Sequence, residues 1–276
     1  MAEKVLLLHG PLNSAGIDPV TQHFPVEERA RCSVNFNAEA TTRASAMAFR
    51  AKGFKIVYSG WLEDAQWLQN NAALFDATVL SDQSGLNEEF IFHGQKSVNN
   101  KGKLYFGVLR GLETTQSAFG DEGIVFRLRS DVTVNPELAI GEFQRVHPKS
   151  GILLIEYLTM NKNFHVPDFM QVAEVGPLLA IYRHLHQLNV SGSSYHISSH
   201  VDHCLTYLRM VELGHLKEIH CMDRPIYDAV VWRGIPRYLE AATAPQGYDK
   251  IMFFTGKVEM PPGSSVESIL EVMKPG

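Results

Sequence analysis

The feature that most constrains the fold is an alternation of short apolar runs with segments of helical period in the first half of the chain. The runs occupy residues 4–10, 54–60, 77–82 and 123–131. Segments whose apolar residues recur at helical spacing come before the last three runs, at residues 40–53, 62–75 and 103–120. Strands that alternate with helices form βαβ units, whose strands pair in parallel. The pattern therefore predicts an α/β fold, with a mostly parallel, Rossmann-like sheet and helices on both faces.

The length and composition are typical of a soluble globular protein with a small-molecule ligand. The chain has 276 residues and a formal net charge of -5 at pH 7, so nothing favours nucleic acid as a partner. The spacing of Cys32, Cys204 and Cys221 fits neither a disulfide framework nor a zinc ribbon, which favours a reducing cytoplasmic setting. No apolar run is long enough to cross a bilayer, so we expect at most peripheral contact with the inner face of a membrane.

Polar or glycine-rich residues follow all four apolar runs. Ligands of parallel α/β sheets lie at the carboxyl ends of the strands, so these residues are candidates for a binding rim. The candidates are Gly10, Pro11, Ser59, Trp61, Asp82 and Asp131. The alternative for each is a turn residue that only ends its strand. Asp82 and Asp131 together are suited to a hard divalent cation.

Five short motifs follow one another in order: "GP" from Gly10, "YSGW" from Tyr58, "LSD" from Leu80, "RGL" from Arg110 and "FRLRSD" from Phe126. This order resembles the WavE-type glycosyltransferases of lipopolysaccharide core and surface-polysaccharide synthesis. The likeness covers roughly residues 4–210. It implies a GT-A type fold, a nucleotide-sugar donor, and a polysaccharide, lipopolysaccharide or other glycan as acceptor, including a lipid-linked saccharide.

The resemblance gives Asp131 a chemical role. Similar enzymes commonly hold Mn²⁺ or Mg²⁺ on an aspartate at a strand exit, where the cation stabilises the leaving nucleoside diphosphate. Lys103 stands near an arginine of the family, although the family's "Asn-Arg-Gln" group is otherwise missing, and Arg129 is the motif arginine. Since "RSDVT" holds a single carboxylate, the alternative is a metal-free site in which Arg127, Arg129 or Lys103 neutralises the phosphates. Structural alternatives are an ion pair of Arg129 with Asp131 and a turn cap at Asp131.

Inverting transfer also requires a base that accepts the proton of the acceptor hydroxyl. Asp168 is the first candidate, because it follows Pro167 at the end of a predicted strand at residues 163–166 and opens a run of helical spacing over residues 168–185. The same position suits a helix N-cap, and the two interpretations are compatible. Glu174 and Asp202 are further candidates.

Three histidines, His196, His200 and His203, have spacings of four and three. On one helix face they would offer three zinc ligands. The alternatives are contacts with the acceptor and plain solvation, since the "ISS" between His196 and His200 is typical of a loop that ends on a Ser N-cap.

We expect residues 1–260 to form one GT-A-like domain, with a donor-binding half (1–135) and an acceptor-binding half (136–260). The chain after residue 215 is expected to return over the site. Residues 261–276 are typical of a linker and a short helix that packs on the domain, pairs with another chain or touches a membrane. The expected function is a glycosyltransferase. The alternatives are a metal-dependent hydrolase of a phosphoester and a non-catalytic glycan-binding protein, and the oligomeric state is not indicated.

Overall fold

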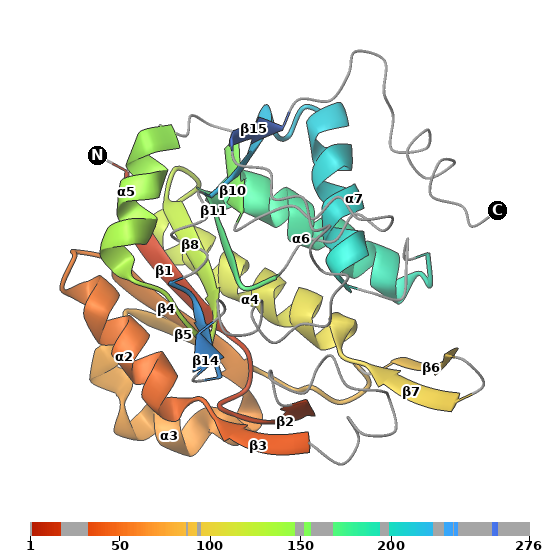
Figure 1. Cartoon of the computed structure of the whole chain (residues 1–276). Coiled ribbons are helices and arrows are strands. Elements are labelled where there is room, and N and C mark those ends of the chain that lie inside the picture. Colours follow the sequence, from red (N-terminus) through yellow and green to blue (C-terminus); the bar gives the residue numbers. More distant parts are fainter. Residues whose placement is uncertain are drawn as a thin grey trace.

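A computed structural model describes residues 2–17, 33–86, 88–92, 95–146, 152–155, 168–193, 199–222, 229–233, 235–236 and 256–258. It is an α/β structure in which helices cover a central sheet (Figure 1). The predicted strand within residues 163–166, the predicted helix in 261–276 and His196 lie outside these residues. None of the described helices has the length and apolar character that crossing a membrane requires.

The central sheet has eight strands in the order β15-β12-β10-β11-β8-β1-β4-β5. The strands are β1 (Lys4–His9), β4 (Lys55–Trp61), β5 (Ala77–Ser81), β8 (Ile124–Arg129), β10 (Ile152–Ile155), β11 (Met170–Glu174), β12 (Glu218–Cys221) and β15 (Gly256–Val258). Strands β5, β4, β1 and β8 are parallel, as are β10 and β12, whereas β11 and β15 run antiparallel to their neighbours. The predicted fold class, an α/β fold with a mostly parallel, Rossmann-like sheet, is confirmed.

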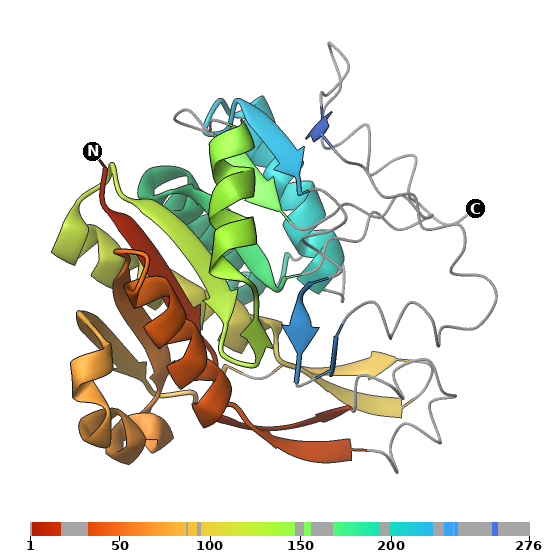
Figure 2. The same ribbon diagram turned by 60° about the vertical axis from the view of Figure 1, so that its left-hand side comes forward.

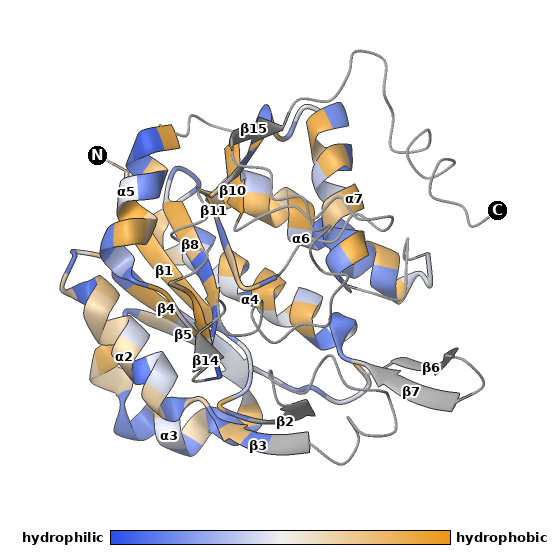
Figure 3. Cartoon of the chain, in the orientation of Figure 1, coloured by the Kyte–Doolittle hydropathy of each residue, from blue (hydrophilic) through white to orange (hydrophobic). Residues whose placement is uncertain are grey.

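Helices lie on both faces of this sheet, also as predicted (Figures 1 and 3). One face carries α4 (Lys101–Phe119), α6 (Val175–Val190) and α7 (Ser199–Glu212), and the other carries α2 (Glu39–Arg50), α3 (Ala65–Asn70) and α5 (Pro136–Val146). Successive residues of β1 alternate between two buried cores: Leu7 belongs to the core under α4 and α6, and Leu6 and Leu8 to the core under α2. This alternation is what a strand covered on both faces requires.

Two helical predictions need correction. The run over residues 168–185 is not one helix, because Met170 and Val172 pack in one core and Ala173 in the other, which makes this segment the strand β11. Helix α6 begins only at Val175, so Asp168 is not a helix N-cap. The run over 62–75 is also divided, into α3 between the 3-10 turns η3 (Leu62–Asp64) and η4 (Ala72–Leu74).

Three small antiparallel units gather near the carboxyl ends of β1, β4 and β8 (Figures 1 and 2). They are the hairpin β2 (Asn13–Ile17) with β3 (Ser33–Asn37), the hairpin β6 (Glu88–Phe92) with β7 (Gln95–Asn99), and a sheet of β9 (Val132–Thr133), β13 (Val231–Trp232) and β14 (Ile235–Pro236). Strand β13 pairs with β9, directly after Asp131. The chain beyond residue 215 thus returns to the end of β8.

Candidate functional site

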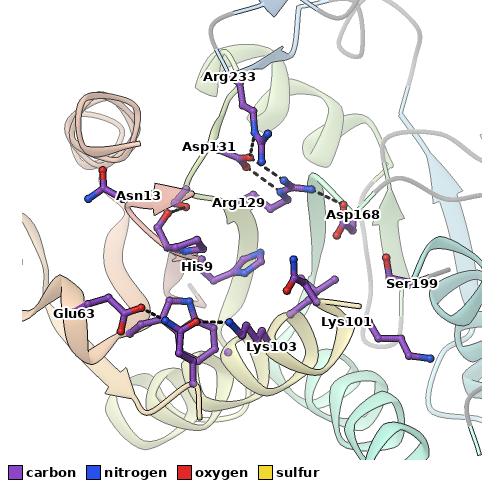
Figure 4. A pocket seen from close by; sticks show the side chains of 18 residues that line it. His9, Asn13, Glu63, Lys101, Lys103, Arg129, Asp131, Asp168, Ser199 and Arg233 are labelled. Carbon is purple, nitrogen blue, oxygen red and sulfur yellow. Dashed lines mark hydrogen bonds and ion pairs between the residues drawn. The ribbon is translucent and has the colours of Figure 1, made fainter. Parts of the chain in front are cut away.

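A cavity of about 390 Å³ opens at the carboxyl ends of β1, β4 and β8 (Figure 4). The lining is completed by the start of α4, Gln83 after β5, Asp168 two residues before β11, Ser199 at the start of α7 and Arg233 directly after β13. Its charged and polar lining residues are His9, Asn13, Glu63, Gln83, Asn100, Lys101, Lys103, Arg129, Ser130, Asp131, Asp168, Ser199 and Arg233. The cavity therefore lies where the parallel sheet predicts a ligand site.

One side of the cavity, here called the arginine wall, consists of Arg129, Asp131, Asp168 and Arg233. Arg129 donates Nε and Nη2 to the two oxygens of Asp131, at 2.9 and 2.8 Å, and Nη1 to Oδ1 of Asp168 at 2.9 Å. Burial would raise the pKa of Asp131, but Arg129 and Arg233 outweigh burial and lower it. At Asp168 burial also raises the pKa, but the nearby cationic groups, Arg129 foremost, lower it far below the usual aspartate range. Both carboxylates are therefore ionised at neutral pH.

Sequence reasoning missed Arg233 and Trp232, which bind Asp131 from the far end of the chain. Oδ2 of Asp131 accepts Nε1–H of Trp232 and Nε–H of Arg233, each at 3.0 Å. The backbone N–H of Arg233 also donates to the carbonyl of Asp131 at 2.9 Å. Arg233 has a φ of +50°, in the left-handed region that residues other than glycine rarely adopt. The contacts to Asp131 hold it there, over a sequence distance that no local motif bridges.

The opposite side, here called the strand-loop wall, consists of Gly10, Trp61, Glu63, Gln83 and Lys103. Lys103 donates Nζ to Oε1 of Gln83 at 2.5 Å, and the Gln83 amide donates to Glu63. Gly10 has a φ of +112°, and a Cβ there would meet Oγ of Ser130 at 3.0 Å, so glycine is required at this turn. These side chains come from the exits of β1, β4 and β5 and the first turn of α4.

Lys101 lines the cavity from the start of α4 but is anchored below it. Its Nζ lies 3.4 Å from Oδ2 of Asp202, and Asp202 also accepts the Tyr105 hydroxyl at 3.0 Å. Asp202 is 1% exposed and does not line the cavity. Its position makes it a partner of Lys101, which removes the reason for proposing it as a catalytic base.

A buried polar layer continues beneath the arginine wall. Burial, followed by Arg127 and Arg129, lowers the pKa of His9 well below its usual value, so its imidazole is neutral. Arg127 is fully buried and donates Nη1 to the carbonyl of Asp168. Among the described residues, Nε2 of His9 and Nε and Nη2 of Arg127 meet no hydrogen-bond partner. His203 is also neutral, because burial lowers its pKa to about 4, and its Nδ1 lies 2.7 Å from the carbonyl of Ser199.

The structure brings together most of the predicted site residues. Those that line the cavity are Gly10, Pro11, Trp61, Lys103, Arg129, Asp131 and Asp168. Ser59 is buried and donates Oγ to the carbonyl of Gly107 at 2.6 Å, so it fastens β4 to α4. Asp82 is exposed and caps its own turn by accepting the N–H and hydroxyl of Ser84. Glu174 pairs with Ile124 at the amino end of β8, away from the carboxyl ends where the cavity lies. Ser59, Asp82 and Glu174 thus lie away from the cavity.

The surroundings of Asp131 do not fit a divalent cation. Hard cations require several oxygen ligands, whereas both oxygens of Asp131 accept N–H groups, two of the donors being arginines. Asp168 shares one of these arginines, and Asp82 lies outside the cavity. In the part of the chain that the structure describes, no three His, Cys, Asp or Glu side chains are grouped as a metal site requires. Among the described residues, His200 and His203 of α7 therefore belong to no such group.

Comparisons with known proteins leave the activity undetermined. No protein-family model and no curated protein sequence matches the chain. Solved structures similar to it include 4-diphosphocytidyl-2C-methyl-D-erythritol synthase from Anaerococcus prevotii, with 10% identity over 87% of this chain and 96% of that chain and a TM-score of 0.43. Another is mouse xyloside xylosyltransferase 1, with 10% identity over 81% and 85% and a TM-score of 0.37.

A nucleotidyl transferase from Methanothermobacter has 13% identity over 68% of this chain and 83% of that chain, with a TM-score of 0.36. Likenesses at these identities and TM-scores carry no argument about activity. The fold class rests instead on the chain's own strand order. The resemblance to WavE-type enzymes finds no support in a family match.

Proposed function

We propose that this chain is a glycosyltransferase that binds the diphosphate of a nucleotide-sugar donor in the cavity. The observation that carries the proposal is that cations line one cavity from two sides. Arg129 and Arg233 stand on the arginine wall, and Lys101 and Lys103 belong to the first turn of α4. Asn100, the N-cap of α4, makes no side-chain cap bond. A diphosphate between the two sides would meet both the cations and the partial positive charge of the helix N-terminus.

Neutral polar groups in the cavity lining suit the rest of a nucleotide. Asn13, Gln83 and Asn100 offer amides that both donate and accept hydrogen bonds, as recognition of a base or ribose requires. Gly10 allows a ligand to approach the backbone closely. A cavity of about 390 Å³ is of ordinary size for a small-molecule ligand.

Transfer would break the bond between the anomeric carbon and the donor phosphate oxygen and form a bond to an acceptor hydroxyl. The leaving diphosphate keeps the bonding electrons, and the cations stabilise the added negative charge. The hydroxyl proton passes to a base. Asp168 lies at the cavity, but its ion pair with Arg129 and lowered pKa make it a weak proton acceptor. His9, a neutral imidazole in the same lining, is the second candidate.

The acceptor proposed is a glycan, including polysaccharide, lipopolysaccharide or a lipid-linked saccharide, by the resemblance of the ordered motifs to WavE-type enzymes. The acceptor is expected on the side of the cavity that Asp168 and Ser199 line, across from the strand-loop wall (Figure 4). We also keep a cytoplasmic location, with at most peripheral membrane contact, as part of this proposal.

A thermal-shift panel tests the proposal. Nucleoside diphosphates and nucleotide sugars should raise the Tm, because a ligand that binds only the folded state stabilises it by mass action. Nucleosides without phosphate are the matched control and should have a much smaller effect. If glycans raise the Tm and every nucleotide fails to, the protein is a glycan-binding protein. If a nucleotide sugar binds and is only hydrolysed in the presence of acceptor glycans, a hydrolase is indicated.

A further inference from the structure

The arginine wall joins two parts of the chain that lie about a hundred residues apart. Trp232 pairs with Val132 where β13 meets β9, and the following residue, Arg233, turns into the cavity lining. The strained backbone of Arg233 is held by its N–H bond to the carbonyl of Asp131. Residues that persist in rare backbone conformations are concentrated at functional sites. The position of Arg233 is thus built into the fold.

Asp131 is the shared anchor of both arginines. Its carboxylate accepts four N–H bonds, two from Arg129 and one each from Trp232 and Arg233. It is 6% exposed. The guanidinium of Arg129 also lies over the rings of Phe169 and Trp232, at 5.3 and 5.7 Å from their centroids. These contacts fix the direction of the Arg129 side chain.

Arg129 keeps donors for a ligand. A guanidinium has five N–H groups in a fork that matches phosphate oxygens. Three of the five are used by Asp131 and Asp168. The side chain is 22% exposed and lines the cavity. Asp131, in contrast, has each oxygen in contact with a cationic donor, which leaves it poorly placed to bind a metal ion.

We propose that the donor phosphates are bound without a divalent cation, and that Asp131 is a positioning residue that holds Arg129 and Arg233 toward them. The pair of strands β13 and β14 then completes the donor site, so the site requires the chain through at least Arg233. This inference rests on the proposed function, since it concerns how the same cavity holds the diphosphate. It assigns to two arginines the counter-charge that a metal ion would otherwise supply.

The first test compares affinities of a nucleoside diphosphate in EDTA and in manganese, measured by calorimetry with the wild-type protein. The two affinities should agree within about twofold. An affinity that appears only with manganese would overturn the inference while leaving the proposed function intact. If no nucleoside diphosphate binds under either condition, the proposed function itself fails, and the inference with it.

The second test orders three substitutions. Arg233→Ala should weaken nucleoside diphosphate binding by roughly 10- to 100-fold, as loss of a charge-assisted contact does, and Arg233→Lys should recover only part of it. Asp131→Asn should have a smaller effect, equal in EDTA and manganese. In all three, affinity for the phosphate-free nucleoside should stay unchanged, which a merely structural defect would not allow.

Two controls match these variants. Arg110→Ala removes an exposed, ion-paired arginine of α4 that does not line the cavity, and Asp76→Asn removes an arginine-paired carboxylate at the opposite end of β5. Neither should alter nucleotide affinity. A larger loss in Asp131→Asn than in Arg233→Ala, seen only with manganese, would assign Asp131 to a metal ion and overturn the proposal.

Discussion

The two walls of the cavity hold their polar groups in different ways. On the arginine wall, charged groups are paired with one another and mostly buried: Asp131 and Asp168 are 6% and 5% exposed. On the strand-loop wall, Glu63 is exposed and Lys103 is half-buried, with the neutral Gln83 between them. The arginine wall is therefore held by buried ion pairs, whereas the charged side chains of the strand-loop wall are more accessible to solvent.

Because of this difference, substitutions in the two walls should affect the stability of the fold and the binding of a ligand to different extents. Removing a member of a buried ion-pair cluster leaves uncompensated charge in the interior, so it costs stability as well as binding. Removing an exposed or half-buried polar group exchanges one contact for water and costs little stability. The walls should accordingly respond differently to substitution and to pH.

The largest effect is expected for Arg129→Ala. It leaves both Asp131 and Asp168 without their shared partner, so the free energy of unfolding should fall by about 3–5 kcal/mol. Nucleoside diphosphate binding should be lost in the protein that remains folded. Urea unfolding and calorimetry measure the two effects. A variant with wild-type stability would show that the arginine wall is not a coupled cluster.

How much of each wall can be predicted from the sequence depends on how far apart along the chain its contacting residues are. Strands β1, β4, β5 and β8 each carry their own apolar run and turn residues, so local pattern predicts them and their carboxyl-end residues. Gly10 and Trp61 of the strand-loop wall follow from this, because they lie at strand exits, whereas Glu63 and Gln83 are not among the predicted candidates. Asp82 and Ser59 do not line the cavity, which could not be predicted because local pattern does not say whether a side chain caps its own turn or bonds a neighbouring helix.

Only part of the arginine wall can be predicted from the sequence. Arg129, Asp131 and Asp168 were singled out, but the partners that decide the role of Asp131 are Trp232 and Arg233, which reach it through tertiary pairing alone. The five residues of β11 are too few for their alternation to be distinguished from helical spacing. That ambiguity accounts for the incorrect N-cap at Asp168.

The second effect concerns pH and the layer beneath the arginine wall. His203 has its pKa lowered to about 4 by burial, from an ordinary value of 6.5. The unfolded chain protonates His203 at a higher pH than the folded protein does. The free energy of unfolding is therefore unaffected by this group above pH 6.5 and falls as the pH falls toward 4. The loss should reach about 3 kcal/mol in urea unfolding between pH 7 and 4.

The matched variant is His203→Gln, which should show a shallower dependence over the same range. His9, whose pKa is lowered too, acts in the same direction and accounts for part of the remaining slope. Equal slopes in the wild type and in His203→Gln would contradict this assignment of the acid sensitivity.

The smallest effect is expected on the strand-loop wall. Lys103→Ala removes a cation whose Nζ contacts the neutral Gln83, so the Tm should stay nearly unchanged. Affinity for a nucleoside diphosphate should fall by roughly tenfold, because a hydrogen bond to a charged phosphate contributes about 1.5 kcal/mol or more. Arg110→Ala, on the same helix but outside the cavity, is the control and should match the wild type in both measurements. A drop in Tm for Lys103→Ala without loss of affinity would make Lys103 a structural residue and contradict its role in binding.

The central claim is that a diphosphate lies between the two walls, and a crystal structure of the protein with a nucleoside diphosphate, grown in EDTA, tests it most directly. The account predicts phosphate oxygens within hydrogen-bond distance of Arg129 and of the first turn of α4, with Asp131 still bonded to Arg129 and Arg233. A nucleotide bound elsewhere on the molecule, or one whose phosphates stand against Asp131 with both arginines displaced, would contradict it.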